Sequence, residues 1–444
     1  MAIPRTFPKP AATRSPRLLL VYPARQKLGW VRRFQLPPLS LMHIAACTPE
    51  PWEVVLADEV QETPPSGKGF DLIGITAMTE QAARAYELAA RYRSEGARVV
   101  LGGIHPTVLP EEAGLHADSV VVGEAEPIWG QVLSDALAGR LAHRYVAPEP
   151  SGDQLAIPWA RKDILVGKRY LTTQTLQASR GCPYDCPFCT VTPYFGRRFR
   201  YRSAEDILAE LRTFRNRMVI FLDDNLLGDP ARAVPLIQGL KRMDFLWAAQ
   251  ITLKVAEDPG LLRLLERSGC FALFVGIESL KGEGSKLAKL RSRFPPADLV
   301  KRIQDAGILV ETSIIFGFDD HTESVFEEAV KFVEECAPCG PTFHLLTPYP
   351  GTEFFRRYEE AGRILHRNWD LYNMNEVVFR PKNMTPDRLY RGWVEARQAV
   401  YAWPALLSRV LRTRHHRFAN LAYNVLRKAP NDHLNPLMGA TEGR

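Results

Sequence analysis

The sequence predicts an α/β protein built from two successive domains and a helical tail. Three observations support this prediction. Short apolar runs alternate with segments of helical periodicity, the alternation pauses once, and the last part of the chain has helical patterns. The expected division is a leader at 1–16, a first domain at 17–140, a linker at 141–171, a second domain at 172–384 and a helical region at 385–444.

The first domain alternates short strands with helices. The runs RLLLVYP, EVVLA, DLIGIT, RVVLGG and SVVVGE have the length and composition of buried strands. Residues 80–96 have the spacing of a helix, with Thr79 as a possible N-cap and Gly96 as its end. Such alternation predicts a parallel, Rossmann-like sheet that binds a ligand at the carboxyl ends of its strands. The glycine fingerprint of nicotinamide-binding domains is absent, which disfavours NAD.

The second domain contains a series of six strand–helix units. The strands are expected near TLQAS, VIFLDD, WAAQIT, FALFVGIES, LVETSIIFG and TFHLLTP, and a helical segment follows each of them. Six units are too few for a closed eight-stranded barrel. The sequence therefore predicts a partial (β/α)6 barrel or an open curved sheet.

Composition excludes several classes of protein. Hydrophobic residues make up 46% and charged residues 24% of the 444 residues, as in ordinary globular proteins. No apolar stretch approaches a membrane span, and the N-terminus lacks the apolar core of a secretory signal. The net charge of +7 is too small to indicate nucleic-acid binding. We therefore expect a cytoplasmic protein that binds no nucleic acid.

Three cysteines lie directly after the first strand of the second domain. Cys182, Cys186 and Cys189 have the spacing C-x3-C-x2-C, and Phe188 precedes the third of them. Three thiolates on one loop can bind three irons of a cubic iron–sulfur cluster, which leaves the fourth iron open to an external ligand.

A zinc site is the alternative interpretation of this segment. It would combine Cys186 and Cys189 with Cys336 and Cys339, but it leaves Cys182 unused. Outside the triplet, the cysteines Cys270, Cys336 and Cys339 lack the compact spacing of a second cluster and are expected to be packed thiols.

The cysteine motif and its position resemble the radical S-adenosylmethionine superfamily, over residues 174–380. The resemblance implies a [4Fe–4S] cluster whose open iron is chelated by S-adenosylmethionine. An electron from a donor such as flavodoxin or ferredoxin would then split the sulfonium bond. The resulting 5′-deoxyadenosyl radical would take a hydrogen atom from an unactivated carbon.

Polar or permissive residues at later strand ends are candidates for binding S-adenosylmethionine. In the family, an acidic motif after the second strand holds the methionine ammonium; here a capping turn is an equally good interpretation. Residues at the fourth strand would contact ribose or the amino acid moiety, and those at the fifth strand would contact adenine. The candidates are Asp223, Asp224 and Asn225, then Glu278 and Ser279, then Ile315 and Gly317.

The loops GGIHPTVLPEE and VVGEAEPIW resemble the cobalamin-binding domain that precedes the barrel in one large subclass of the superfamily. The D-x-H-x-x-G motif, which supplies an axial histidine to cobalt, is missing, so cobalamin would bind without it. His105 is either a cobalt neighbour or a turn histidine, and some members keep the fold without binding cobalamin. The candidate cofactor residues are Thr76, Gly102, Gly103, His105, Gly123 and Glu124.

Together these resemblances imply a cobalamin-dependent radical C-methyltransferase acting on a small or lipid-like substrate. One alternative is a cyclase, oxidase or rearrangement enzyme of the anaerobic porphyrin cyclase type. The alternative without catalysis is a cobalamin or iron–sulfur sensor.

The sequence also contains two basic segments. The first carries Arg197, Arg198, Arg200 and Arg202 after the cysteines, and we expect it to bind a small anion or to surround an anionic cluster. The second, at 403–428, combines apolar residues at helical spacing with Arg, Lys and His. It would either dock on the barrel or make peripheral contact with a membrane surface.

Overall fold

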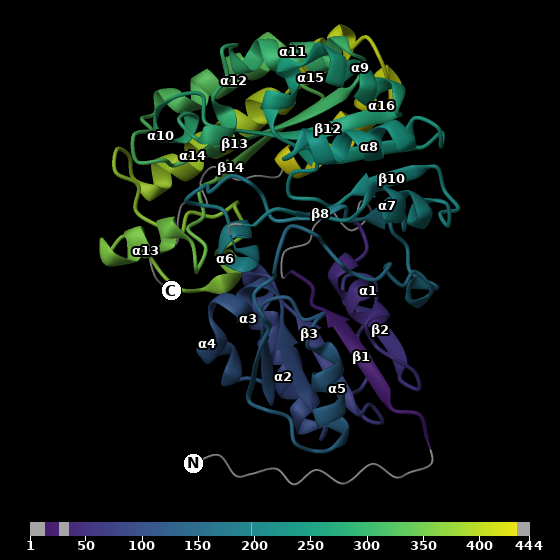
Figure 1. The fold of residues 1–444 in the computed structure, drawn as a ribbon. Helices are drawn as coiled ribbons and strands as arrows, with labels where there is room; N and C mark the ends of the chain where they lie inside the picture. Colours follow the sequence, from purple (N-terminus) through teal and green to yellow (C-terminus); the bar gives the residue numbers. More distant parts are fainter. Residues whose placement is uncertain (1–13, 26–34, 197, 433–444) are drawn as a thin grey trace. The chain divides into compact units, whose positions relative to one another are not determined.

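The computed structural model describes residues 14–25, 35–196 and 198–432 (Figure 1). Most of the predicted leader, residues 1–13, and Arg197 lie outside the described residues. The chain divides into two compact units. Unit 1 comprises residues 1–152, 156–173 and 193–195, and unit 2 comprises residues 153–155, 174–192 and 196–444.

Unit 1 contains a parallel sheet of six strands in the order β2-β1-β3-β4-β5-β6. The middle of β1 is fully buried, because helices cover both faces of a parallel sheet. Chain order reverses between β1 and β3, where a doubly wound sheet opens toward a ligand. The strands are β1 (Arg17–Tyr22), β2 (Glu53–Asp58), β3 (Leu72–Thr76), β4 (Val99–Gly102), β5 (Ser119–Val122) and β6 (Arg144–Val146).

The secondary structure of unit 1 differs from the sequence prediction in three details. An apolar helix, α1, was not predicted, and β6 lies inside the predicted linker. Thr79 does not cap α2; it begins the short helix η2 (Thr79–Gln81), where the amide of Met78 donates to Gln81 Oε1 at 3.0 Å. The helices are α1 (Leu39–Ala46), α2 (Ala82–Ser94), α3 (Ile104–Val108), α4 (Pro110–Gly114), α5 (Trp129–Leu137) and the short η3 (Asp163–Leu165).

Unit 2 contains the second parallel sheet, with six strands in the order β14-β13-β12-β11-β10-β7. This arrangement confirms the predicted open series of six strands. The strands are β7 (Thr175–Leu176), β10 (Met218–Phe221), β11 (Leu246–Ile251), β12 (Cys270–Glu278), β13 (Leu309–Phe316) and β14 (Gly340–Leu345).

Helices cover the outer face of this sheet, as Figure 1 shows for α11 and α12 beside β12 and β13. Their apolar faces and the strands form one large core. Side-chain caps start several of these helices; Asp229, for example, accepts from the amide of Ala231 at 3.1 Å. The helices of unit 2 are α7 (Ala204–Leu211), α8 (Pro230–Leu240), η4 (Leu253–Glu257), α9 (Pro259–Arg267), α10 (Gly282–Ser285), η5 (Ala288–Leu290), α11 (Pro296–Asp305), α12 (Ser324–Cys336), α13 (Glu353–Glu360) and η6 (Trp369–Leu371). The short helix α6 (Val191–Phe195) follows the cysteines, and its last three residues belong to unit 1.

Three further helices confirm the predicted helical C-terminal region: α14 (Pro386–Tyr401), α15 (Trp403–Arg412) and α16 (Arg417–Asp432). Trp393 on α14 is fully buried, and its indole donates to the carbonyl of Phe343 on β14 at 2.8 Å. The described part of the chain contains no helix long and apolar enough to cross a membrane.

Candidate functional site

The cysteine-bearing loop of unit 2 has a hydrogen-bonded base. Strands β8 (Ser179–Arg180) and β9 (Arg200–Tyr201) pair in antiparallel fashion, so the loop between them leaves and returns at one point. Asp223, at the end of β10, lies beneath this base. Its carboxylate accepts from the amide of Ala178 at 3.1 Å and from the hydroxyl of Ser179 at 2.5 Å.

Asp223 therefore holds the base of the cysteine loop through hydrogen bonds to its carboxylate. Its carboxylate is fully buried, and burial raises its pKa to about 7. These contacts give it a local structural role, in contrast to the expectation that it holds a methionine ammonium.

Asp224 and Asn225 have a different environment from Asp223. The buried atoms Oδ2 of Asp224 and Oδ1 of Asn225 have no hydrogen-bond partner in the protein. The amide group of Asn225 lies 3.9 Å from the sulfur of Cys182. The capping interpretation is wrong for these residues, because Asp229 caps α8. Although the backbone of Gly181 bonds to the Asp224 carboxylate, each side chain has one buried oxygen without a partner beside the cysteine loop. Such an oxygen can accept a hydrogen bond from a polar ligand.

Aromatic packing fixes the cysteine loop above the sheet. The ring of Phe188 packs edge-on against Phe318, with centroids 5.9 Å apart, and against Phe354 at 6.2 Å. The amide of Phe354, at the start of α13, donates to the carbonyl of Pro187 at 3.0 Å. The aromatic residue of the motif therefore anchors the loop to the core.

The donor set of this loop fits an iron–sulfur cluster. Cys182, Cys186 and Cys189 are free thiols, and burial raises the pKa of Cys186 to about 11 and that of Cys189 to about 12. Thiols of this kind become thiolates when they bind metal. Within the described ranges, no three His, Cys, Asp or Glu side chains converge on a single ion position. A cubic cluster needs no such point, because each thiolate binds a different iron.

The zinc interpretation is wrong. Cys336 ends α12 and Cys339 immediately precedes β14, so both lie at the amino end of that strand. The cysteine loop follows the carboxyl end of β7, at the opposite edge of the same parallel sheet. Both thiols are buried, as is Cys270, in agreement with their interpretation as packed cysteines.

Lys289 is a residue of this region that sequence reasoning missed. Its ammonium forms an ion pair with Glu278 and lies 5.9 Å from the centroid of the Phe188 ring. Burial alone would lower the pKa of Lys289, but Glu278 and the cysteine thiols raise it above its usual range. The segment KGEGSKLAKLRSRF contains several cations, and no sequence signal distinguishes this lysine from the others.

The backbone at the end of β12 is shaped for this ion pair. Glu278 adopts a φ of 60°, and the register of β12 against β13 shifts beside it. A Cβ atom on Gly276 would lie 2.1 Å from Oε1 of Glu278 and 3.3 Å from Nζ of Lys289. Glu278 is therefore held inward, toward the cysteine loop, as a pair with Lys289.

The remaining candidates of unit 2 are mostly engaged within the protein. His321 accepts from the amide of Gly317 through Nδ1 at 3.3 Å, and its Nε2 lies 2.8 Å from Oγ of Ser279. Gly317 has a φ of 113°, and a Cβ atom there would meet Leu389 and Phe379 at 3.1 Å. Tight packing thus explains this glycine. Ile315 on β13 is partly buried against the core.

Arginines of the basic segment divide by role. Arg200 and Arg202 are buried, and Arg202 pairs with Glu210 at 2.7 Å and with Asp206 at 2.6 Å. Arg198 is exposed. Arg202 therefore has a structural role, whereas we expected from the sequence that the segment would bind a small anion or surround an anionic cluster.

In unit 1, two adjacent glycines at the end of β4 have different environments. Gly103 has a φ of 99°, and a Cβ atom there would lie 2.7 Å from Oγ1 of Thr76 and 2.9 Å from the backbone of Ala77. A Cβ atom on Gly102 would have only one neighbour within 4 Å, Cβ of Val121 at 3.9 Å. Gly103 lets α3 approach the end of β3, whereas the space beside Gly102 is open.

His105 is buried beneath this edge of the sheet. Its Nε2 lies 3.0 Å from the hydroxyl of Tyr86 and 3.2 Å from Oε1 of Glu112, and none of its surface is exposed. These contacts favour the structural interpretation over a cobalt neighbour. The partners of its ring are side chains of α2 and α4.

Contacts within unit 1 also fix the backbone at the end of β5. The amide of Gly123 donates to Oγ1 of Thr107 at 3.0 Å, and Gly123 has a φ of 87° that favours glycine. Glu124, which follows it, is buried. The ends of β3, β4 and β5 thus meet along one edge of the sheet.

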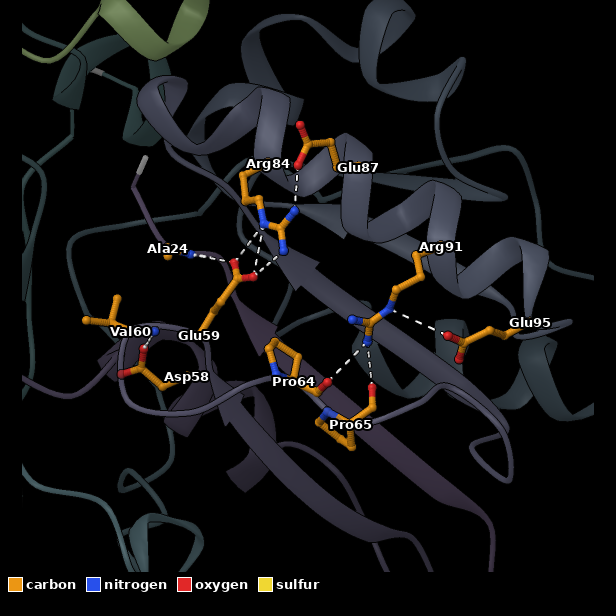
Figure 2. Close-up of polar contacts among 10 residues, drawn as sticks. All are labelled: Ala24, Asp58, Glu59, Val60, Pro64, Pro65, Arg84, Glu87, Arg91 and Glu95. Carbon is orange, nitrogen blue, oxygen red and sulfur yellow. Dashed lines mark hydrogen bonds and ion pairs between the residues drawn. The ribbon is translucent and has the colours of Figure 1, made fainter. Parts of the chain in front are cut away.

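A cavity of about 630 Å³ lies at the carboxyl ends of β1 and β2, and the sequence did not indicate it. Figure 2 shows its charged wall: Arg84 on α2 holds Glu59 with its Nε at 3.0 and 3.1 Å, and it holds Glu87 at 2.5 Å. Arg91 donates to the carbonyl of Pro65 at 2.7 Å. Pairing neutralises these charges, so the wall is polar without a strong excess of either sign.

Two family models match the chain in the order of the two units. The model of the B12 binding domain matches residues 27–133, and that of the radical SAM superfamily matches residues 176–333. Bacteriochlorophyllide d C-12(1)-methyltransferase of Chlorobaculum tepidum is 30% identical over 84% of this chain and 84% of its own length. Hopanoid C-2 methylase of Rhodopseudomonas palustris is 27% identical over 84% of this chain and 73% of its own.

A solved structure shares the fold. The radical S-adenosylmethionine methyltransferase TsrM from Kitasatospora setae, with cobalamin and a [4Fe–4S] cluster bound, superposes with a TM-score of 0.62. The match covers 78% of this chain and 75% of TsrM at 18% sequence identity. This likeness confirms the predicted fold, in which an N-terminal Rossmann-like domain is followed by a partial barrel.

Proposed function

The chain belongs to the radical S-adenosylmethionine enzymes that carry a cobalamin-binding domain, and we propose that it transfers a methyl group to an unactivated carbon of a lipophilic substrate. Its cofactors are accordingly an iron–sulfur cluster, S-adenosylmethionine and cobalamin. The observation that carries the proposal is the presence of both domains, in order, in a chain 30% identical to a methyltransferase over 84% of each sequence.

In this proposal, the cysteine loop of unit 2 binds the cluster and the polar groups beside it orient S-adenosylmethionine. When bound, the cluster supplies the electron that cleaves S-adenosylmethionine, and cobalamin carries the methyl group. Cys182, Cys186 and Cys189 hold the metal. Asp224 and Asn225 have unsatisfied oxygens at this loop, and they accept hydrogen bonds from a cationic ammonium.

Other residues at this site form its walls and exclude water from it. The pair of Glu278 and Lys289 occupies the end of β12 and shields the loop from solvent on that side. Ile315 supplies an apolar wall for a flat aromatic base. Excluding water protects a reactive radical from side reactions.

The edge of the unit 1 sheet is the proposed cobalamin surface. Gly102 leaves open space at the end of β4; on either side of it, Thr76 ends β3 and Gly123 directly follows β5. Backbone can come close to a large planar ligand at such positions. His105 is left out of this surface, because its ring is buried and bonded to Tyr86 and Glu112.

The proposed substrate is a rigid, largely apolar molecule. Relatives are named for methyl transfer to bacteriochlorophyllide d and to hopanoids, and both names describe lipophilic polycyclic compounds. The proposal also includes an external one-electron donor such as flavodoxin or ferredoxin. Peripheral contact with a membrane would bring such a substrate to the enzyme.

Isotope labelling tests this proposal. Protein reconstituted without oxygen is incubated with reductant, cobalamin, CD3-labelled S-adenosylmethionine and a lipid extract of cells that lack the gene. We expect a lipid-soluble product in which a CD3 group replaces hydrogen, formed only when cobalamin is present. A labelled nucleotide or protein in place of a lipid would refute the proposed substrate class. A dehydrogenated product without label would refute methyl transfer.

A further inference from the structure

The last two helices of the described chain, α15 and α16, expose apolar side chains that the described residues do not cover. On α15 these residues recur every fourth position, and on α16 they follow the same helical spacing, so each helix carries an apolar stripe. The exposed members are Trp403, Leu407, Leu411, Phe418, Val425 and Leu426.

The opposite faces of both helices already dock on unit 2. Leu406 and Val410 on α15 are buried. Arg409 donates to Oδ1 of Asn424 at 2.8 Å, and Nδ2 of Asn424 donates to the carbonyl of Cys339 at 2.8 Å. Docking therefore leaves the apolar stripes outside, where soluble proteins usually place polar residues.

Charge identifies the kind of partner. Residues 403–428 contain no Asp or Glu. Arg409 is buried and Arg427 pairs with Glu311, so the cations that face outward are Arg412, Arg414 and Arg417, together with the partly buried Lys428. Lys428 lies 5.4 Å from the centroid of the Trp403 ring, so cations and the apolar stripe are neighbours. A second copy of the chain would bring like charges together, whereas an anionic surface would be attracted.

A cavity beside the turn between the helices has the same character. It has a volume of about 350 Å³, and Lys301, Arg412, Arg414 and His415 contribute to its lining. Asp305 lies 3.4 Å from Arg414, and Glu335 pairs with Lys301 at 2.9 Å, so acidic groups offset part of this charge. The cavity is large enough for an anionic headgroup next to the apolar stripes.

We propose that α15 and α16 form a membrane-docking surface that binds bilayers rich in anionic phospholipid. The stripes enter the boundary between headgroups and acyl chains, and the exposed arginines Arg412, Arg414 and Arg417 contact the phosphates. This mode needs no spanning helix, and none is found among the described residues. The inference goes beyond the proposed methyl transfer and stands without it, because neither cofactor nor turnover enters its evidence.

Vesicle co-sedimentation of the full-length protein tests the proposal, with two matched double variants. Leu411→Glu/Phe418→Glu changes residues that are 71% and 85% exposed on the stripes. Leu115→Glu/Val166→Glu changes residues of unit 1 that are 78% and 84% exposed, so it adds the same charge at similar exposure. Circular dichroism checks that both variants are folded.

We expect the wild type to bind vesicles of phosphatidylcholine with phosphatidylglycerol, and binding to weaken as salt rises. The Leu411→Glu/Phe418→Glu variant should lose at least about tenfold in partitioning, whereas the unit 1 variant should bind within about twofold of the wild type. Arg414→Ser/Arg417→Ser should also weaken binding, in contrast to Arg212→Ser/Arg242→Ser on another surface.

Three results would overturn the proposal. The wild type could fail to bind anionic vesicles at low salt. The two Glu variants could bind equally well. The wild type could also be a dimer that Leu411→Glu/Phe418→Glu converts to a monomer without affecting vesicles, and the stripes would then be an interface between copies.

Discussion

Glu278 and Lys289 form an ion pair at the end of β12, with only 8% and 16% of their side chains exposed. The same ammonium lies 5.9 Å from the centroid of the Phe188 ring, which belongs to the cysteine motif. A cation is thus held next to the proposed cluster by a carboxylate and an aromatic ring. Its position should matter for electron transfer, because a cluster gains negative charge when it is reduced.

Replacing Lys289 should make the cluster harder to reduce. In Lys289→Met, Glu278 is left uncompensated, and we expect the midpoint potential to fall by on the order of 50 mV. Glu278→Gln should shift the potential in the opposite direction, and the double variant should return close to the wild type. Redox titration followed by electron paramagnetic resonance measures all three, and equal potentials in all of them would contradict this electrostatic role.

Removal of one cysteine of the motif should remove the cluster. We expect anaerobically reconstituted wild type to contain about four irons per chain, and Cys182→Ala to contain much less and to form no 5′-deoxyadenosine. Cys270→Ala is the matched control, because Cys270 is a buried thiol on β12 outside the loop. Equal iron content in the two variants would exclude the proposed ligand.

Alanine substitution of the two glycines at the end of β4 should affect two different properties, stability and cobalamin binding. A Cβ atom on Gly103 collides with the backbone of Ala77, and its φ of 99° is strained for alanine. Gly103→Ala should therefore lower the thermal stability of unit 1. Gly102→Ala should fold normally, since the nearest neighbour lies at 3.9 Å, but it should bind cobalamin several-fold more weakly.

Calorimetry and absorbance titration with hydroxocobalamin distinguish these two effects. Normal folding of Gly103→Ala would contradict the steric argument. Unchanged cobalamin binding by Gly102→Ala would place the cofactor elsewhere than at the end of β4.

His321 should make the stability of the apoprotein depend on pH. Burial lowers the pKa of His321 to about 4, although Asp320 and Glu328 act in the opposite direction. The neutral ring fits the site because Nδ1 accepts from the amide of Gly317. The stability that depends on this neutral form is present above about pH 6.5 and is lost as pH falls toward about 4.

The variant His321→Asn isolates this contribution, because its Oδ1 can still accept from Gly317 and does not titrate. Between pH 7.5 and 5.0, urea unfolding of the wild type should lose about 2 kcal/mol more than unfolding of the variant. Equal losses in the two proteins would show that the ring is protonated without penalty.

The sequence predicted most of the architecture because strands, helices and the cysteine motif leave local signals. Apolar runs flanked by turn residues predicted eleven of the twelve strands in the two six-stranded sheets of the described chain. Spacing alone indicated the three cysteines as cluster ligands. The strand β6 was missed because RYV is only three residues long and alternates exposed and buried positions. Helix α1 was missed because its buried, nearly uniform apolar surface lacks helical periodicity.

The candidate site was predicted less completely, because roles depend on contacts that a sequence does not show. Three polar residues in a row, Asp223, Asp224 and Asn225, have the same sequence signal, yet only the first is satisfied by the backbone of Ala178. Gly317 and Gly103 looked like openings for a ligand, but side chains or backbone fill the space beside them. Lys289 becomes distinctive only when the fold brings it to Glu278.

The ratio of the two products formed from S-adenosylmethionine distinguishes cobalamin-dependent methyl transfer from other radical reactions. A radical methyl transfer that uses cobalamin consumes one S-adenosylmethionine for the methyl group and a second for hydrogen abstraction. We expect S-adenosylhomocysteine and 5′-deoxyadenosine to accumulate in equal amounts with the methylated product, and neither to form in Cys182→Ala beyond a slow background. Formation of 5′-deoxyadenosine and product without S-adenosylhomocysteine would contradict methyl transfer and indicate a cyclase, oxidase or rearrangement enzyme.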